Sequence, residues 1–269
     1  MKKIISQILL LVVGFLATWQ LLAQVPWVKL TKVREVRSEL EIQLGEIVWD
    51  DISMQHYEIT DKKVVAPVDS ILERLCKAAA IEKDSIQLHI ISDSEVNAFA
   101  LPDKQLVINS GLIANCRNSN ELAGVMAHEL AHITQGHVMQ KLVQEIGLAT
   151  LTSISTGNAD VGTIVRILSS SAFSREAERE ADITAVDYLT KANIAAADMA
   201  NFLYRLGTNK NALEKYTAWM STHPDTEERA MYIIKESKRK QGKDFRPDAP
   251  IHTQTMEKLK KAVKEIDGN

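Results

Sequence analysis

Cysteine is scarce in this chain of 269 residues, which contains only Cys76 and Cys116. Neither belongs to a C-x-x-C pair or has the spacing of a zinc ribbon, so we do not assign them as metal ligands. In an oxidising compartment the two thiols can pair. Two separate buried thiols are the slightly favoured interpretation, because free cysteine behaves as a small apolar residue.

Aromatic residues and net charge are also low, at 5% of residues and −3 respectively. A general nucleic-acid binder would be strongly basic, so no nucleic-acid partner is expected. The few aromatics do not suggest a surface that stacks bases or sugars. Internal repeats of about 20–50 residues are absent, which argues against a solenoid. The hydrophobic fraction of 45% is sufficient for the core of one enzyme-sized domain.

The longest apolar run lies at the N-terminus. A short basic start, Met1-Lys2-Lys3, precedes a largely apolar stretch over residues 4–23. This length suits a membrane anchor, and a cleaved signal peptide has the same layout. Residues 1–23 are therefore predicted to be a signal peptide or a membrane anchor, with neither option preferred. Both place the protein outside the cytoplasm, in the cell envelope or periplasm, and an uncleaved segment would attach it to the membrane.

The most informative motif is H-E-L-A-H at residues 128–132. Residues four apart lie one turn apart on the same face of a helix. His128 and His132 can therefore direct two imidazoles at one zinc ion. Glu129 lies beside them, where a carboxylate can take the proton of a water activated by the metal.

A long helix is predicted around this motif, from Glu121 to about Ile146. Its apolar residues recur at helical spacing and no proline interrupts it, and Asn118 is a candidate cap at its start. On one continuous helix, His137 would lie about 140° around the axis from His132. We therefore expect His137 either at the surface or hydrogen-bonded behind a ligand, and not at the ion itself.

A third zinc ligand is expected on a second helix, over residues 174–189. A catalytic zinc usually has three protein ligands and one open position. Arg175, Glu178 and Asp182 are spaced to share a face of this helix. Glu178 can bind the ion, and Asp182 can accept a hydrogen bond from a ligating histidine. Such a charged run is more often only solvated, but beside an H-E-x-x-H motif the ligand role is favoured.

Four stretches of the sequence together resemble a known family. They are N-A-F-A-L-P at 97–102, H-E-L-A-H at 128–132, E-R-E-A-D at 178–182 and T-H-P at 222–224. They are similar to the gluzincin zinc metallopeptidases that include HtpX, the CaaX prenyl protease and the periplasmic protease BepA, over roughly residues 44–237. The resemblance implies that Glu178 is the third ligand and that Asp182 is the family's conserved-motif aspartate. One departure is Asp103-Lys104, where similar proteins have two glycines.

The expected fold class is α+β and mostly helical, a zincin-like metallopeptidase domain with a small β-sheet before the H-E-x-x-H helix. A helix is predicted over residues 67–81, and strands over 86–91, 98–100 and 105–109. Three regions follow the leader: an N-terminal helical or linker segment over 24–66, with a helix interrupted at Gly45; a zinc metallopeptidase domain over 67–240; and a basic C-terminal tail over 241–269. Apolar residues of the tail recur three or four apart, which favours a final helix docked on the body.

The second predicted strand is a candidate for substrate binding. An extended peptide can add to an exposed sheet edge through backbone hydrogen bonds. Asn97, Ala98, Phe99 and Ala100 form the candidate edge, and the Asn97 amide is placed to hold the substrate backbone as well. A role in packing alone is about equally favoured, because any small sheet has an exposed edge. Residues 147–174, which carry few charges, fit either a mobile lid or a packed helix.

His223 is the last candidate for the site. Its imidazole can stabilise the oxyanion of a tetrahedral intermediate, or it can occupy the open zinc position and keep the enzyme latent. A histidine before proline is more often a helix-start residue, and the family resemblance favours the functional roles. Arg229 is a weaker candidate for the same charge stabilisation.

These features predict a zinc metalloendopeptidase with one Zn²⁺ per chain. His128, His132 and Glu178 would bind the metal, Glu129 would act as the general base and His223 would assist catalysis. The substrate would be a polypeptide, such as a misfolded or envelope protein. The alternative is a chaperone-like envelope assembly factor whose zinc site is structural or silent. The specific substrate and the oligomeric state do not follow from the sequence.

Overall fold

The computed structural model describes the backbone of residues 33–208 and 213–268. The predicted leader over residues 1–23 lies outside this part of the chain, so the choice between signal peptide and anchor stays a prediction. Among the described helices, none combines the length and the apolar character needed to cross a bilayer. Residues 41–269 form one compact unit, distinct from residues 1–40, and the site lies entirely within it.

A three-stranded sheet forms the small β-component of this unit. It consists of β1 (Gln87–Ile91), β2 (Ala98–Leu101) and β3 (Gln105–Asn109), in the order β1-β3-β2. β3 runs parallel to β1 and antiparallel to β2. Asp103 and Lys104 make the tight β2–β3 turn, with φ angles of 58° and 55°. The turn thus keeps a left-handed backbone without the glycines of similar proteins, at a cost of about 1–2 kcal/mol per residue.

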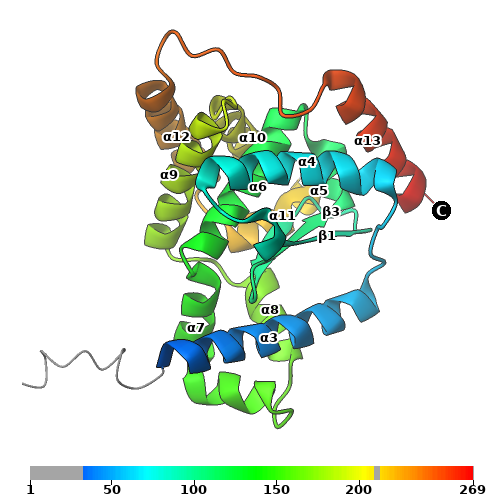
Figure 1. Ribbon diagram of the computed structural model, residues 1–269, viewed down its shortest axis with the longest axis vertical. Helices are drawn as coiled ribbons and strands as arrows, with labels where there is room; N and C mark the ends of the chain where they lie inside the picture. Colours follow the sequence, from blue (N-terminus) through cyan, green and yellow to red (C-terminus); the bar gives the residue numbers. More distant parts are fainter. Residues whose placement is uncertain (1–32, 209–212, 269) are drawn as a thin grey trace, which may run out of the picture. The chain divides into compact units, whose positions relative to one another are not determined.

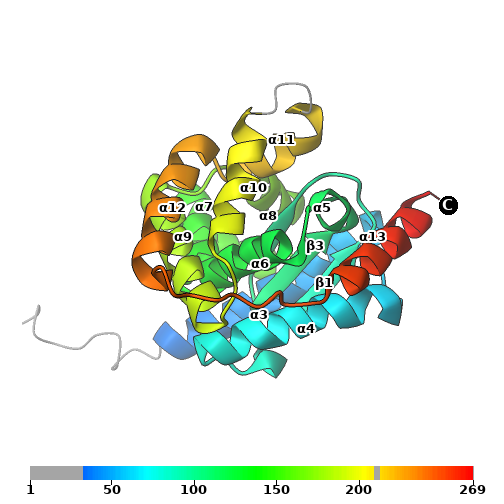
Figure 2. The same ribbon diagram turned by 90° about the horizontal axis from the view of Figure 1, so that it is seen from above.

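Helices account for most of the rest, which confirms the α+β, mostly helical class. They are α3 (Val33–Gln55), α4 (Lys62–Ala79), α5 (Ser110–Asn115), α6 (Ser119–Thr134), α7 (His137–Ser155), α8 (Gly162–Ser170), α9 (Arg175–Lys191), α10 (Ala197–Thr208), α11 (Leu213–Thr222), α12 (Thr226–Gln241) and α13 (Thr253–Asp267), with a 3₁₀ turn over Lys83–Ser85. α6 packs against α9, α10 and β2, and α12 packs against α9 and α10 (Figures 1 and 2). α13 lies against α4 and α5 (Figure 1).

Alternation along the strands divides the sheet into two faces. One face contributes buried residues to the main core, which also contains the apolar sides of α4, α6 and α10: Ala98, Leu106 and Ile108. On the other face, His89 of β1 stacks on Trp49 of α3 with a ring separation of 3.6 Å. Cys76 and Cys116 are separate, buried free thiols, as the favoured interpretation held.

Two helix boundaries differ from the prediction at the N-terminal side. α3 continues through Gly45 without interruption. The glycine allows a close approach between α3 and the β2–β3 turn and does not end the helix. A Cβ at this position would lie 2.6 Å from the Cβ of Asp103. α4 begins at Lys62, ahead of Pro67, because the Asp61 side chain caps it by accepting a hydrogen bond from the Lys63 amide at 2.8 Å.

The single long helix predicted over residues 121–146 is wrong, because α6 ends at Thr134 and α7 begins at His137. Gly136 separates them with a φ of 69°, a left-handed conformation that commonly terminates helices. Gly147 then kinks α7 with a φ of 77°. Beyond it, α8 buries Ile164 and Leu168, so this part of residues 147–174 is a packed helix.

Candidate metal centre

The two histidines of the H-E-L-A-H motif lie one turn apart on α6 and point at a common centre. Their Nε2 atoms are 3.1 Å apart, and both side chains are fully buried. α6 is held at its start by the Asn118 side chain, which accepts a hydrogen bond from the Glu121 amide at 2.9 Å. The motif therefore occupies the middle of a well-anchored, buried helix.

Glu178 reaches the same centre from α9. Its Oε1 lies 3.4 Å from His132 Nε2, and its Oε2 lies 3.6 Å from His128 Nε2. α9 can approach α6 closely because small residues, Ala181 and Ala185, are buried on α9. The helix predicted from residue 174 begins at Arg175, with Ser174 capping it through a hydrogen bond from the Ala177 amide.

His223 brings a third imidazole to the centre from the end of α11. Its Nδ1 lies 2.9 Å from Glu178 Oε1 and 3.2 Å from His128 Nε2. The donor atoms of His128, His132, Glu178 and His223 all lie within 4.8 Å of one another. Zinc bonds of about 2.0–2.1 Å in a tetrahedron place ligand atoms roughly 3.3 Å apart. The observed separations bracket this value, so the donor set fits a zinc ion.

The second nitrogens of the two motif histidines have partners of their own. His128 Nδ1 lies 2.9 Å from Asp182 Oδ1, and His132 Nδ1 lies 3.0 Å from His137 Nδ1. Each ring is thereby turned so that its Nε2 faces the centre. His137 is buried, so the surface alternative is wrong. The helix break at Gly136 changes its direction and brings it behind His132.

Asp182 is also held by two groups of α12. Its carboxylate accepts hydrogen bonds from Arg229 Nε and Nη2, both at 2.8 Å, and from the Tyr232 hydroxyl. Burial raises the pKa of Asp182, but the charge of Arg229 and the contact with His128 outweigh burial and hold this pKa far below its usual range. Arg229 also pairs with Glu178. It therefore neutralises two buried carboxylates beside the metal centre.

Glu129 lies next to the donor cluster with no hydrogen-bond partner for either carboxylate oxygen among the described residues. The nearest basic atom is His223 Nε2, at 3.5 Å from Oε1. Burial raises the pKa of Glu129 to about 8, against the opposing effects of His128 and the Ala100 backbone amide. A buried carboxylate without partners is costly, and one with a raised pKa is well suited to accept and return a proton.

Three residues that the sequence did not single out enclose this centre. Trp219 stacks on His223 with a ring separation of 4.3 Å, and Phe173 lies 4.1 Å from the His132 ring. The Lys141 ammonium lies over Phe173 at 4.3 Å and donates to the Ser171 carbonyl. Only Trp219 had a usable signal, since it lies one helical turn before His223. The other two, Lys141 in α7 and Phe173 in the α8–α9 loop, reach the centre only through the tertiary fold.

The candidate substrate strand is at an edge of the sheet, since β2 pairs only with β3. The Asn109 amide donates to the Asn97 carbonyl at 3.1 Å, so this pair is hydrogen-bonded. Hydrogen-bonded and non-bonded pairs alternate in an antiparallel ladder, and the backbone groups of Ala98 and Ala100 therefore point away from β3. No other backbone group of the described residues bonds to these outward groups. The edge is nevertheless covered, since Ala98 is 0% exposed, Ala100 is 3% exposed and the Ala100 amide faces Glu129.

Relatives of this chain carry names that include a proteolytic activity. The beta-barrel assembly-enhancing protease of Escherichia coli is 25% identical over 204 residues, which are 70% of this chain and 42% of that protein. The mitochondrial metalloendopeptidase OMA1 of Schizosaccharomyces pombe is 24% identical over 195 residues, 71% of this chain and 55% of the relative. The metalloprotease LoiP of Escherichia coli is 27% identical over 194 residues, 65% and 75% respectively.

The chain also matches the model of a protein family. The chain spans less than half the length of the beta-barrel assembly-enhancing protease, so the likeness does not extend to that whole protein. The sequence profile of peptidase family M48 covers residues 63–236, which is most of the chain and includes all four clustered donors and Glu129. This protein therefore belongs to peptidase family M48, as its motifs indicated.

Proposed function

We propose that this protein is a zinc endopeptidase in which His128, His132 and Glu178 bind the metal. The observation that carries the proposal is Glu129, a buried carboxylate without partners beside a cluster of four metal-binding side chains. A structural zinc site needs no such group, whereas hydrolysis needs a base at this place. This favours an enzyme over an assembly factor with a silent site.

Each residue of the site has a distinct part in the proposed reaction. A zinc ion bound here would supply a Lewis acid and activate a water at neutral pH. Glu129 takes a proton from the attacking water and returns it to the departing amine. Asp182 orients the His128 ring, and Arg229 balances the charge of the buried carboxylates.

The outer edge of β2 is the proposed binding site for the substrate backbone, once the segments that bury Ala98 and Ala100 have moved. Ala98 and Ala100 direct their backbone groups away from β3, so an extended peptide can pair with them as an added strand. The Ala100 amide is also close enough to Glu129 to lower its pKa. A substrate strand at this edge would therefore bring a peptide bond to the base, and backbone hydrogen bonds would hold it there.

His223 is proposed to hold the enzyme in a latent state rather than to assist the oxyanion. Its Nδ1 already lies among the donor atoms, and burial lowers its pKa to about 4, which leaves a lone pair for a metal. The whole donor set and Glu129 are buried. His223 and the aromatic rings around it must therefore move before a peptide can reach the site.

The cell envelope is the proposed location and envelope or misfolded proteins are the proposed substrates. The apolar segment over residues 4–23 and the name of the relatives that enhance beta-barrel assembly support this placement. Backbone pairing at the strand edge suits unfolded chains, whose backbone groups are unpaired. Whether the leader is cleaved decides between an anchored and a released form, and the intact mass of the mature protein answers this.

Substitution of the proposed base tests the function. We expect Glu129→Gln to retain one zinc per chain, because glutamine keeps the volume of the side chain. The rate at which it cleaves an unfolded protein such as casein should fall about a thousandfold or more, because the base is removed. Zinc is measured by elemental analysis, and cleavage with and without a chelator. Glu257→Gln, on the exposed face of α13, is the matched control. Cleavage by Glu129→Gln at the parental rate would exclude Glu129 as the base.

A further inference from the structure

A groove of about 580 Å³ lies beside β2, separate from the buried metal centre. One wall is the end of α3 together with His56, which follows it. The other walls are one side of α8 and the turn formed by Ser92–Glu95. β2 contributes Phe99 and Leu101, and Asn97 and Asn109 line it from adjacent strand ends. All of these residues belong to the compact unit of residues 41–269. The groove is therefore next to the edge proposed to hold the substrate.

Two buried amides in the groove lack partners. Asn97 is 4% exposed and Asn109 is 2% exposed, and neither side-chain oxygen makes a hydrogen bond with a described residue. The two residues are direct neighbours across β2 and β3. Leaving a buried polar group unpaired is unfavourable. A carboxamide both donates and accepts, so a peptide backbone in the groove would satisfy both groups.

The charge of the groove has one sign. Asp93 and Glu95 contribute carboxylates, and none of the described lining residues is a lysine or an arginine. Glu95 is exposed and makes no ion pair with a described residue. Asp93 Oδ1 accepts the Glu95 amide at 2.9 Å, and its Oδ2 lies 3.7 Å from His56 Nδ1. The groove therefore attracts cations.

Apolar residues complete the match to a particular side chain. Ile52, Val165 and Leu168 line the groove together with Phe99. Lysine and arginine side chains pack their aliphatic stems on such surfaces while their charged ends reach polar groups. A neutral aliphatic side chain would leave the two carboxylates unused, and an acidic side chain would be repelled by them.

We propose that this groove is a specificity subsite for a basic side chain of the polypeptide substrate, with Asn97 and Asn109 positioning the adjoining backbone. The inference rests on the proposed peptidase function. Asn97 is three residues along β2 from Ala100, about 10 Å at the rise of a strand. Because Ala100 lies beside Glu129, the basic residue falls two to four positions from the bond that is cleaved.

Matched peptides test the preference. Short unstructured fluorogenic peptides carry lysine, norleucine or glutamate at each position around one cleavable bond, since norleucine has the stem of lysine without its charge. We expect kcat/KM to be highest for lysine at a single position two to four residues from that bond. Glu95→Gln should reduce the lysine-to-norleucine ratio about five-fold. Glu257→Gln, which removes an equally exposed charge from α13, should leave the ratio unchanged.

Direct binding separates this inference from the peptidase function. The Glu129→Gln protein is titrated with labelled lysine and norleucine peptides, and anisotropy gives the two dissociation constants. We expect the lysine peptide to bind more tightly at low salt, and the difference to shrink at high salt. Asn97→Ala should weaken both peptides about equally, and Asn201→Ala, at an exposed position of α10, should weaken neither.

Each outcome bears on one of the two proposals. Equal binding and equal cleavage of the lysine and norleucine peptides, or an unchanged ratio in Glu95→Gln, would overturn the subsite. Selective binding of the lysine peptide without cleavage of any peptide by the parental protein would support the subsite and count against the peptidase function. Weaker binding of both peptides by Asn201→Ala would overturn the assigned positioning role of Asn97.

Discussion

At the scale of single residues, the site depends on partners that lie behind the metal-binding atoms. Asp182 accepts from His128 and from Arg229 and makes a contact with Tyr232, so one carboxylate fixes an imidazole of α6 to α12. Such partners hold a ligand's orientation and strengthen its basicity. The groups that orient a proposed ligand are therefore part of the site as well.

Asp182→Asn should weaken zinc binding about 10–100-fold. The amide keeps the shape but loses the charge that faces the His128 ring and balances Arg229. Affinity is measured by competition with a coloured zinc chelator. Asp187→Asn is the control on the same helix, because Asp187 is half-exposed and pairs with Lys240 away from the centre. Equal affinity of Asp182→Asn and the parental protein would contradict this orienting role.

His223→Ala should raise peptide hydrolysis several-fold while one zinc stays bound. The imidazole lies where the open zinc position is expected, and three ligands suffice for a catalytic zinc. Initial rates on a short peptide and metal content are both measured. A large loss of turnover with full zinc would instead assign His223 to catalysis. Unchanged kinetics would remove it from the site.

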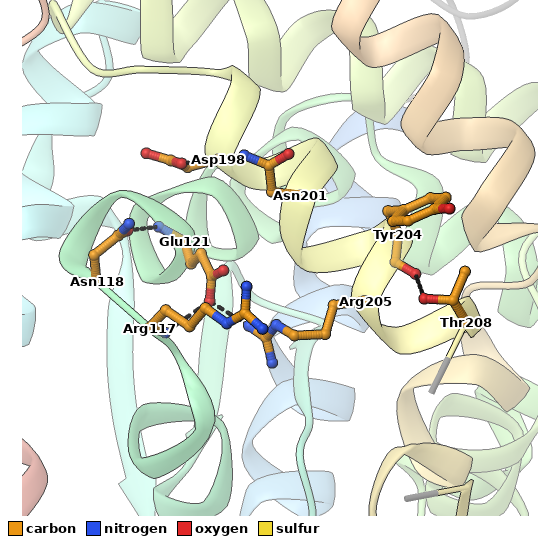
Figure 3. A pocket seen from close by; sticks show the side chains of 8 residues that line it. All are labelled: Arg117, Asn118, Glu121, Asp198, Asn201, Tyr204, Arg205 and Thr208. Carbon is orange, nitrogen blue, oxygen red and sulfur yellow. Dashed lines mark hydrogen bonds and ion pairs between the residues drawn. The ribbon is translucent and has the colours of Figure 1, made fainter. Parts of the chain in front are cut away.

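At the scale of elements, the start of α6 is tied to α10 by one buried carboxylate. Figure 3 shows Glu121 between Arg117 and Arg205, in a pocket of about 690 Å³. Glu121 Oε2 accepts from the Arg117 amide at 2.7 Å and pairs with the Arg205 guanidinium, while Asn118 caps the helix. The helix that carries the motif is thus fixed at its N-terminus, two turns from its first histidine.

Glu121→Ala should lower the free energy of unfolding by about 3 kcal/mol. The substitution removes the acceptor of the Arg117 amide and leaves Arg205, whose side chain is only 14% exposed, without its counter-charge. Urea denaturation measures the change. Glu265→Ala, which breaks an exposed pair with Lys261 on α13, should have almost no effect. Similar stabilities for the two variants would show that the buried pair does not anchor α6.

A second feature of the elements is the break between α6 and α7. Gly136 has a left-handed backbone with open space around it, so its role is conformational and not a close approach. The turn redirects the chain and places His137 against His132. A helical-wheel calculation cannot anticipate this contact, because it assumes that the helix continues.

At the scale of the whole molecule, the donor cluster joins parts of the chain that are far apart in sequence. α6, α9 and the end of α11 meet at one point. Bringing four polar side chains together in a dry interior is unfavourable without a counter-charge. A bound cation would therefore stabilise the fold as well as serve the reaction.

Removal of the metal should lower the melting temperature by about 10 °C. Ligand that binds only the folded state at a thousand times its Kd adds about 4 kcal/mol, and each kcal/mol shifts the midpoint by about 2–4 °C at this size. Thermal melting with zinc and with excess chelator measures the shift. Glu129→Gln should show the same shift, and His128→Ala should show little. If the melting temperature of the parental protein does not change with chelator, a bound metal ion does not stabilise the fold.

Local patterns in the sequence determined that the H-E-L-A-H motif lies on a helix, that three strands precede it, and that a second helix carries Glu178 and Asp182 on one face. These features depend on periodicity and on spacing within one element, which the sequence displays directly. The tertiary structure decided that His223 joins the donors and that His137 lies behind His132. It also decided that Arg229 pairs with both Asp182 and Glu178 and that β2 is an edge strand of the sheet. Each of these depends on how separate segments pack against one another, and such contacts are set by the direction of chain turns and by burial, which no single stretch of sequence records.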